Sequence, residues 1–132
     1  MDMFVQQIEI AEQLRKPMVI HCVRAFNELM ALRKQHPLTP WVVHGFVGSL
    51  PLCHQLLDHA IDLSFGAALL DRRRAKVRNT FVHTDLHRLF LETDDSGADI
   101  SAIYHEAALL HGCCLSDLTE AIKNHYLALF NQ

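Results

Sequence analysis

The chain has 132 residues and a formal net charge of −3, with 50% hydrophobic and 20% charged residues. This length suits one domain, which we take as residues 1–132, and the composition is that of a globular protein. The small negative charge excludes general polyanion binding, so any contact with nucleic acid has to be local. No apolar run approaches the ~20 residues of a membrane span, and the opening residues do not resemble a signal peptide. We therefore expect a cytoplasmic protein without membrane contact.

Helices and short apolar strands alternate along the chain. The first helix is expected over residues 2–15, where apolar residues have helical spacing: Phe4, Ile8, Ala11 and Leu14. Later helices are expected over residues 24–35, 49–60, 71–83, 100–110 and 116–130. Strands are expected over residues 18–22, 41–46, 61–66 and 88–94. Short buried strands separated by helices are typical of right-handed βαβ units, so the pattern predicts an α/β fold with one parallel sheet.

Three of these strands end in side chains that can bind metals or transfer protons. His21 ends M-V-I-H, His44 follows W-V-V, and L-F-L-E-T-D-D ends in Glu92, Asp94 and Asp95. The carboxyl ends of parallel strands meet at one edge of a sheet, which is where α/β proteins keep their chemistry. Two imidazoles and a carboxylate there could hold one divalent ion, with Glu92 and Asp95 as further candidate ligands.

The other histidines form one candidate pair. His83 and His87 are four residues apart, a spacing that could chelate a metal on one helix face. They lie where a helix ends before the next strand, however, so a solvated pair is the preferred interpretation. No partner can be named from the sequence for four others: His36, His105, His111 and His125.

The four cysteines show no metal-binding or redox spacing. There is no C-x-x-C pair, and the neighbouring Cys113 and Cys114 are poor partners for each other. Cysteines of this kind are usually reduced and buried in proteins of a reducing compartment. We therefore expect free, mostly buried thiols.

A basic run follows the third expected strand. Residues 72–78 contain four arginines and Lys76, on the side from which a substrate would approach the strand ends. Such residues could contact DNA phosphates, and the alternative is a solvated helix face, which we place slightly ahead. Trp41 and the phenylalanines fit core packing better than base stacking.

Taken together, the strand ends resemble the TatD family of metal-dependent deoxyribonucleases, which are amidohydrolase-like TIM barrels. Five stretches carry the resemblance, in order and at helix-sized intervals: P-M-V-I-H-C-V-R-A (17–25), V-V-H-G-F-V-G-S (42–49), D-L-S-F-G (62–66), R-L-F-L-E-T-D (88–94) and the closing N-H-Y-L-A-L-F (124–130). The match covers nearly the whole chain and corresponds to strands five to eight of the family barrel. The resemblance therefore implies a partial TIM barrel of four parallel βα units, with an N-terminal helix and C-terminal helices.

The resemblance also implies residue roles. His21 and His44 correspond to the family's metal ligands on the fifth and sixth strands. Asp94 corresponds to the acid of the eighth strand, a metal ligand and catalytic residue that orients the attacking water. Arg24 corresponds to an arginine near the site that contacts substrate. The implied cofactor is a divalent metal (Zn, Mg or Mn), with two ions in a complete barrel, and the implied substrate is DNA.

Two family motifs have no counterpart in these 132 residues. The His-x-His pair of the first strand and the glutamate of the fourth are missing, and the family loop after L-E-T-D is replaced by Asp95-Ser96-Gly97-Ala98. One expectation is therefore an impaired deoxyribonuclease. The alternative is a truncated, catalytically inactive half-barrel that acts only as a binding or vestigial protein.

Half a barrel would also leave apolar side chains uncovered. Four parallel strands have two open edges, and their inward faces lack the opposite half of the barrel. We expect the following residues, or their neighbours, to face water: Val42, Phe46, Phe65 and Phe90. The chain would then form a homodimer, bind a separate N-terminal half-barrel, or be a poorly stable product of a broken reading frame.

Overall fold

A parallel four-stranded sheet forms the centre of the molecule. The structure, a computed structural model, describes residues 2–22, 24–93 and 96–130. The strands are β1 (Met18–His21), β2 (Trp41–His44), β3 (Ile61–Phe65) and β4 (Leu89–Leu91). They pair in the order β1-β2-β3-β4, and every neighbouring pair is parallel. The predicted α/β fold with consecutive βα units is therefore confirmed.

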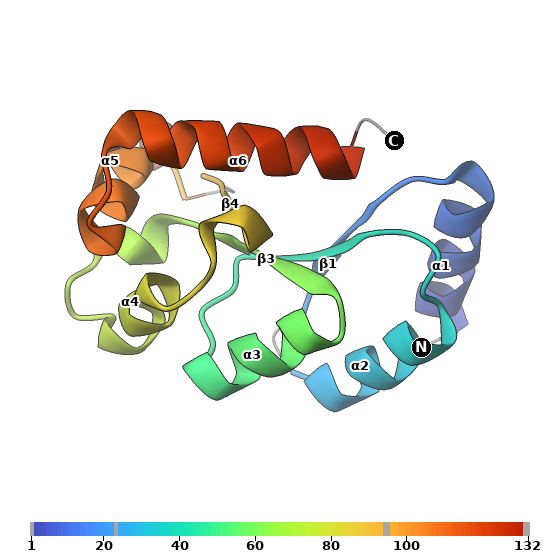
Figure 1. Cartoon of the computed structure of the whole chain (residues 1–132). Helices are drawn as coiled ribbons and strands as arrows, with labels where there is room; N and C mark the ends of the chain where they lie inside the picture. The colour runs from blue at the N-terminus through green and yellow to red at the C-terminus, as the bar shows by residue number, and fades with distance from the viewer. Residues whose placement is uncertain (1, 23, 94–95, 131–132) are drawn as a thin grey trace.

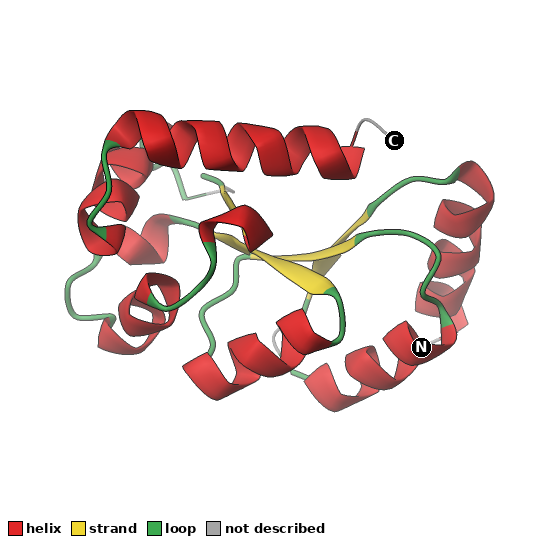
Figure 2. Cartoon of the chain, viewed as in Figure 1, coloured by secondary structure: helices red, strands yellow, loops and turns green. Residues whose placement is uncertain are grey.

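Helices cover the sheet from two sides (Figure 1). They are α1 (Asp2–Leu14), α2 (Phe26–Gln35), α3 (Leu50–Asp58), α4 (Ala75–Val82), α5 (Ile100–His111) and α6 (Leu115–Phe130), with the short 3-10 helices η1 (Ala67–Leu70) and η2 (Leu86–Arg88). Figure 2 shows the strands between α6 on one side and α2 and α3 on the other. In the described part of the chain, no helix is both long and apolar enough to cross a membrane.

The sheet face that carries Trp41 packs against the first helices. Trp41 is paired in register with Ile61, and all three side chains of Trp41, Val43 and Leu63 are buried. Phe4 of α1 meets the Trp41 ring edge to face, with ring centroids 6.0 Å apart. Alternate residues of a strand point to the same face, so the apolar residues at every second position lie together on this face. The prediction that Trp41 belongs to the core is confirmed.

The opposite face, which we call the α6 face, is covered unevenly. In-register pairs place Val19, Val42, Asp62, Ser64 and Phe90 on it. Over β4, the Phe90 ring stacks on His125 of α6, with centroids 4.1 Å apart. Over β1, no described helix gives such cover, and Val19 is 60% exposed.

The expected water exposure is wrong for the four named half-barrel side chains, but it holds for Val19, the neighbour paired in register with Val42. Val42, Phe46 and Phe65 are buried, and Phe90 is half-buried. Phe46 and Phe65 belong to an edge-to-face aromatic chain that continues to Phe81 of α4, on the helix side of the sheet. The exposed apolar residue of the strands is Val19 instead, because α6 reaches β4 but not β1.

Several element boundaries differ from the sequence expectation. The predicted helix over residues 71–83 is shorter, since α4 begins at Ala75, after η1 and a turn. Asp71 does not cap α4; its carboxylate accepts the Arg73 backbone N–H at 3.0 Å. Ala25 has a left-handed backbone with φ of 63°, so α2 begins two residues late. The helical stripe of α1 is also narrower than predicted, because Leu14 is 63% exposed.

The burial of the cysteines differs from the sequence expectation, whereas the exposure of His83 and His87 agrees with it. All four cysteines are free, but only Cys53 is buried and Cys114 is exposed, so the expectation of mostly buried thiols is wrong. Cys113 and Cys114 lie in the turn between α5 and α6, which reaches the surface. His83 follows the last residue of α4 and His87 lies in η2; both are exposed, as expected for a solvated pair.

Candidate metal centre

His21 and His44 lie side by side at the carboxyl ends of neighbouring strands. They are paired in register, and His21 Nδ1 is 3.2 Å from His44 Nε2. Two nitrogens bound at ~2.05 Å to one tetrahedral ion are separated by ~3.3 Å. The distance between these two ring nitrogens therefore suits two ligands of a single metal ion.

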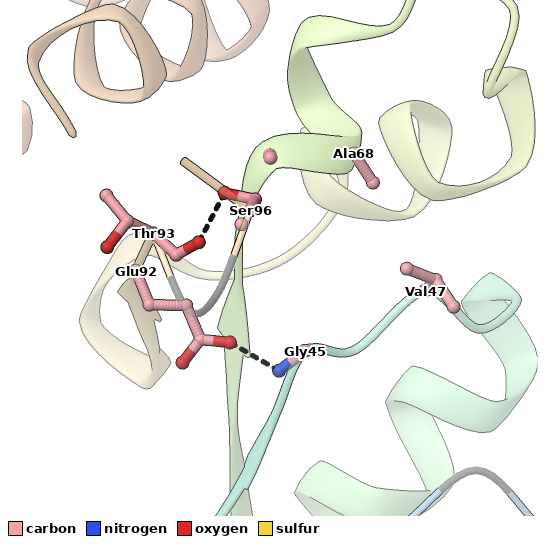
Figure 3. Close-up of a pocket in the computed structure, with 8 residues that line it drawn as sticks. Gly45, Val47, Ala68, Glu92, Thr93 and Ser96 are labelled. Carbon is pink, nitrogen blue, oxygen red and sulfur yellow. Dashed lines mark hydrogen bonds between the residues drawn. The ribbon is translucent and has the colours of Figure 1, made fainter. Parts of the chain in front are cut away.

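Glu92 joins the end of β4 to the end of β2. Its Oε1 accepts the Gly45 N–H at 2.6 Å, as Figure 3 shows, and lies 3.7 Å from His44 Nδ1. Its own backbone N–H donates to the Phe65 carbonyl at 2.9 Å. Gly45 has φ of +64°, a left-handed backbone that glycine adopts without steric cost. His44 thus lies between the His21 ring and the Glu92 carboxylate.

The described residues do not complete a three-ligand site. Within residues 2–22, 24–93 and 96–130, no three His, Cys, Asp or Glu side chains are grouped so that they could hold a metal ion. Asp94 and Asp95, which the sequence proposes as ligands, lie outside the described residues. The structure therefore brings together His21, His44 and Glu92, and the role of Asp94 stays a prediction.

Arg24 lies close to His21, just beyond the carboxyl end of β1. Its side chain is exposed, and it borders, with His21 and Cys22, a hollow of about 330 Å³. The Cys22 thiol donates to the Arg24 carbonyl at 2.6 Å. Burial raises the pKa of the Cys22 thiol.

Two further hollows flank the loop that follows His44. One, of about 270 Å³, is bordered by Glu92, Thr93 and Ala68 (Figure 3). The other, of about 360 Å³, is bordered by His21 and Lys76. Gly45 and Val47 border both hollows, so this loop separates them.

The basic run of residues 72–78 splits into paired and exposed cations. Arg78 Nη1 lies 2.9 Å from Glu106 Oε2 and also donates to the Leu69 carbonyl, so Arg78 fastens α4 to α5. Arg73 pairs with Asp71 at 3.1 Å. Lys76 is exposed. The solvated-face interpretation therefore fits part of the run, and Arg78 is structural.

Sequence reasoning gave no place to the Glu92–Gly45 hydrogen bond. The signal was present in the strand period, which puts Glu92 on the same side of its strand as Asp94. The alternation along one strand does not, however, predict how β4 is aligned with β2, because β3 lies between them. The contact between Glu92 and Gly45 depends on that alignment.

TIM-barrel enzymes keep their catalytic residues at the carboxyl ends of consecutive parallel βα strands, and imidazoles placed there can bind a metal ion. The family model described as TatD related DNase matches residues 1–124, and the chain belongs to this family. It is 23% identical over 143 residues to the uncharacterized metal-dependent hydrolase YcfH of Escherichia coli K12, across 97% of this chain and 54% of YcfH. It is 30% identical over 99 residues to the 3'-5' ssDNA/RNA exonuclease TatD of Klebsiella pneumoniae, across 69% of this chain and 36% of that protein.

A solved structure agrees. The crystal structure of the TatD homologue YjjV from Escherichia coli K12 matches with a TM-score of 0.86 and 25% identity, over 96% of this chain and 54% of YjjV. The chain therefore spans about half the length of YcfH and YjjV. The expected resemblance to one part of a TatD barrel is confirmed.

Proposed function

We propose that this chain carries part of the active site of a metal-dependent nuclease that hydrolyses DNA phosphodiester bonds, with His21, His44 and Asp94 as metal ligands. The observation that carries the proposal is the 3.2 Å separation of the His21 and His44 ring nitrogens at adjacent strand ends. The substrate class follows from family membership and from a relative named as an ssDNA/RNA exonuclease.

Each residue has a distinct role in this proposal. His21 and His44 hold the ion through neutral imidazole nitrogens. When bound, a divalent metal supplies a Lewis acid that activates water and offsets charge on the phosphate. Asp94 completes the ligand set and orients the attacking water, and Arg24 binds a substrate phosphate. Glu92 holds the loop after His44 through the Gly45 N–H.

The donor set also bears on the choice of metal. Imidazole nitrogen suits zinc and the later transition metals, whereas magnesium prefers oxygen ligands and retains several waters. Two imidazoles and one carboxylate therefore favour Zn²⁺ over Mg²⁺ or Mn²⁺ at this position. A second ion, as the family resemblance implies for a complete barrel, would require ligands beyond these three.

The exposed part of the α6 face over β1 is evidence for a partner chain. Val19 of the edge strand β1 is 60% exposed, and an unpaired edge strand is a template for further strands. We infer that strands from a second copy or from an N-terminal half-barrel cover it. Sedimentation velocity on the chain alone, and on the chain mixed with an N-terminal half, distinguishes the two; a folded monomer that binds neither excludes both.

Metal content of the purified chain tests the metal site directly. Elemental mass spectrometry after zinc loading and desalting is expected to give near-stoichiometric metal in the parent chain and little in a His21→Ala/Asp94→Ala variant. His54→Ala, an exposed histidine on α3, is the matched control and should keep the metal. Equal metal in all three would mean adventitious surface binding.

A chain without activity is the second candidate. It is favoured by the lack, in these 132 residues, of counterparts to the family's His-x-His pair and strand-four glutamate. Metal bound through His21 and Asp94, followed by cleavage of a labelled oligonucleotide, supports the nuclease. Metal without cleavage supports a binding half-barrel that keeps the ligands, and no metal at all leaves a vestigial chain.

A further inference from the structure

We propose that the hollow between His21 and Lys76 binds one nucleotide of a single-stranded nucleic acid, adjacent to the phosphate at the metal centre. We call it the Lys76 hollow; it is bordered by His21, Cys22, Phe26, Gly45, Phe46, Val47, Gly48, Ser49, Leu52 and Lys76. The proposal rests on the proposed nuclease function and adds a substrate subsite to it. In this subsite, Lys76 binds a phosphate of the nucleotide and the apolar wall of the hollow packs against its base.

The hollow has a suitable size and a direct connection to the candidate site. Its volume is about 360 Å³, within the ~300–1,000 Å³ of small-molecule sites. His21, a proposed metal ligand, is part of its wall. A strand whose phosphate lies at His21 therefore has its next nucleotide beside this hollow.

Lys76 supplies the charge that a phosphate needs. Among the described residues, no carboxylate forms an ion pair with its ammonium group, whereas Arg73 and Arg78 of the same basic run are paired with Asp71 and Glu106. The ammonium group of an exposed lysine without a carboxylate partner is available to bind an anionic ligand. Lys76 borders a hollow whose wall also includes His21, a proposed metal ligand.

The rest of the wall is apolar and partly aromatic. Phe26 is half-buried and meets the Phe46 ring edge to face, with centroids 6.3 Å apart. Val47 is 39% exposed on the loop side. Every nucleobase has an apolar face that stacks on aromatic rings, so this wall suits a base without selecting its sequence.

Oligonucleotide binding without cleavage tests the phosphate contact. Fluorescence anisotropy with a labelled oligo-dT in EDTA measures the affinity of the chain across a salt series. We expect Lys76→Ala to weaken binding and to lower the salt slope by about one phosphate contact. Lys34→Ala, the same charge change at the far end of α2, should leave both unchanged.

A second variant tests the base contact. Phe26→Leu keeps an apolar side chain but removes the ring, and its folding is checked by circular dichroism. With 2-aminopurine in the oligonucleotide, we expect the fluorescence quenching of the parent chain to be lost, and affinity to fall by about fivefold.

The outcomes separate this proposal from the proposed function. Loss of affinity in Lys76→Ala and loss of quenching in folded Phe26→Leu support the subsite. The proposal is overturned if Lys76→Ala binds as the parent does, if Arg72→Ala has the larger effect, or if the parent binds no oligonucleotide. The metal content of Lys76→Ala is expected to equal that of the parent, so failure of the subsite leaves the metal centre intact.

Discussion

Asp62 of β3 and His125 of α6 meet on the α6 face, with His125 Nε2 2.9 Å from Asp62 Oδ2. The other ring nitrogen, Nδ1, lies 2.9 Å from the carbonyl oxygen of Leu89 in β4. Both neighbours are acceptors, so both bonds form together only when the ring carries two N–H groups. Arg88 also binds Asp62, at 2.7 Å. This buried network therefore joins α6 to two strands and covers an edge of the sheet.

Removal of the His125 ring should be costly. His125→Ala loses two hydrogen bonds and the stacked contact with Phe90, so we expect the free energy of unfolding to fall by ~3 kcal/mol. Urea denaturation measures it. Lys123→Ala, an exposed change on the same helix, should lie within ~0.5 kcal/mol of the parent. A loss of less than ~1 kcal/mol for His125→Ala would mean that α6 is held by its apolar contacts alone.

The elements of this fold were predictable because their signals are local. Strand period, helical spacing and the Pro and Gly positions lie within one segment, and they located every strand of the described sheet to within a few residues. The partner of His125 was not predictable, since Asp62 is 63 residues away. For the same reason, the sequence did not predict that α6 covers Phe90. The covering ring is His125, which lies near the far end of the chain.

The glycine after His44 should be intolerant of a side chain. Gly45 has φ of +64°, a conformation that costs other residues ~1–2 kcal/mol. We expect Gly45→Ala to lose about that much stability and to shift the N–H away from Glu92, which weakens zinc binding in calorimetric titration. Gly112→Ala has similar strain at φ of +70° but lies at the end of α5. Gly112→Ala should lose stability with its zinc affinity unchanged. If both variants bind zinc equally well, the conformation of Gly45 has no effect on the metal centre.

Arg33 should not be replaceable by lysine. Its guanidinium donates to the carbonyls of His36, Thr39 and Ala60 and lies 4.9 Å from the centroid of the Trp41 ring. A lysine ammonium cannot reproduce this planar set of bonds. We expect Arg33→Lys to lower the free energy of unfolding by ~2 kcal/mol in urea denaturation. Lys34→Arg is the exposed control on α2 and should have no measurable effect.

Thiol reactivity should follow burial. Burial raises the pKa of Cys22 and Cys53, so at a given pH a smaller fraction of each thiol is ionised than in an unfolded chain. At pH 8, we expect iodoacetamide to modify the exposed Cys114 first, Cys22 slowly and Cys53 only on unfolding. Peptide mass spectrometry over time measures this order. In concentrated urea the four rates should converge, and early labelling of Cys53 in the native chain would contradict the buried assignment.

The candidate site was only partly within reach of the sequence. Because strand ends of a parallel sheet converge, His21 and His44 could be placed together in advance, and their ring contact agrees with that placement. The hydrogen bond from Gly45 to Glu92 depends on the twist and register of three strands, which no local pattern specifies. The metal-ligand roles of His21, His44 and Asp94, and the substrate role of Arg24, remain predictions for the experiments above.

Zinc should stabilise the parent chain if the paired imidazoles share an ion. A ligand that binds only the folded state stabilises it by RT ln(1 + [L]/Kd), or ~2.7 kcal/mol at a hundredfold excess over Kd. For a domain of this size, that corresponds to a rise of ~10 °C in the Tm. We expect this rise in scanning calorimetry at neutral pH, its reversal by EDTA, and its loss in His44→Ala. Because the imidazoles bind metal in their neutral form, the rise should shrink as the pH is lowered. His54→Ala should keep the full effect, and an equal rise in His44→Ala would place the bound zinc elsewhere on the chain.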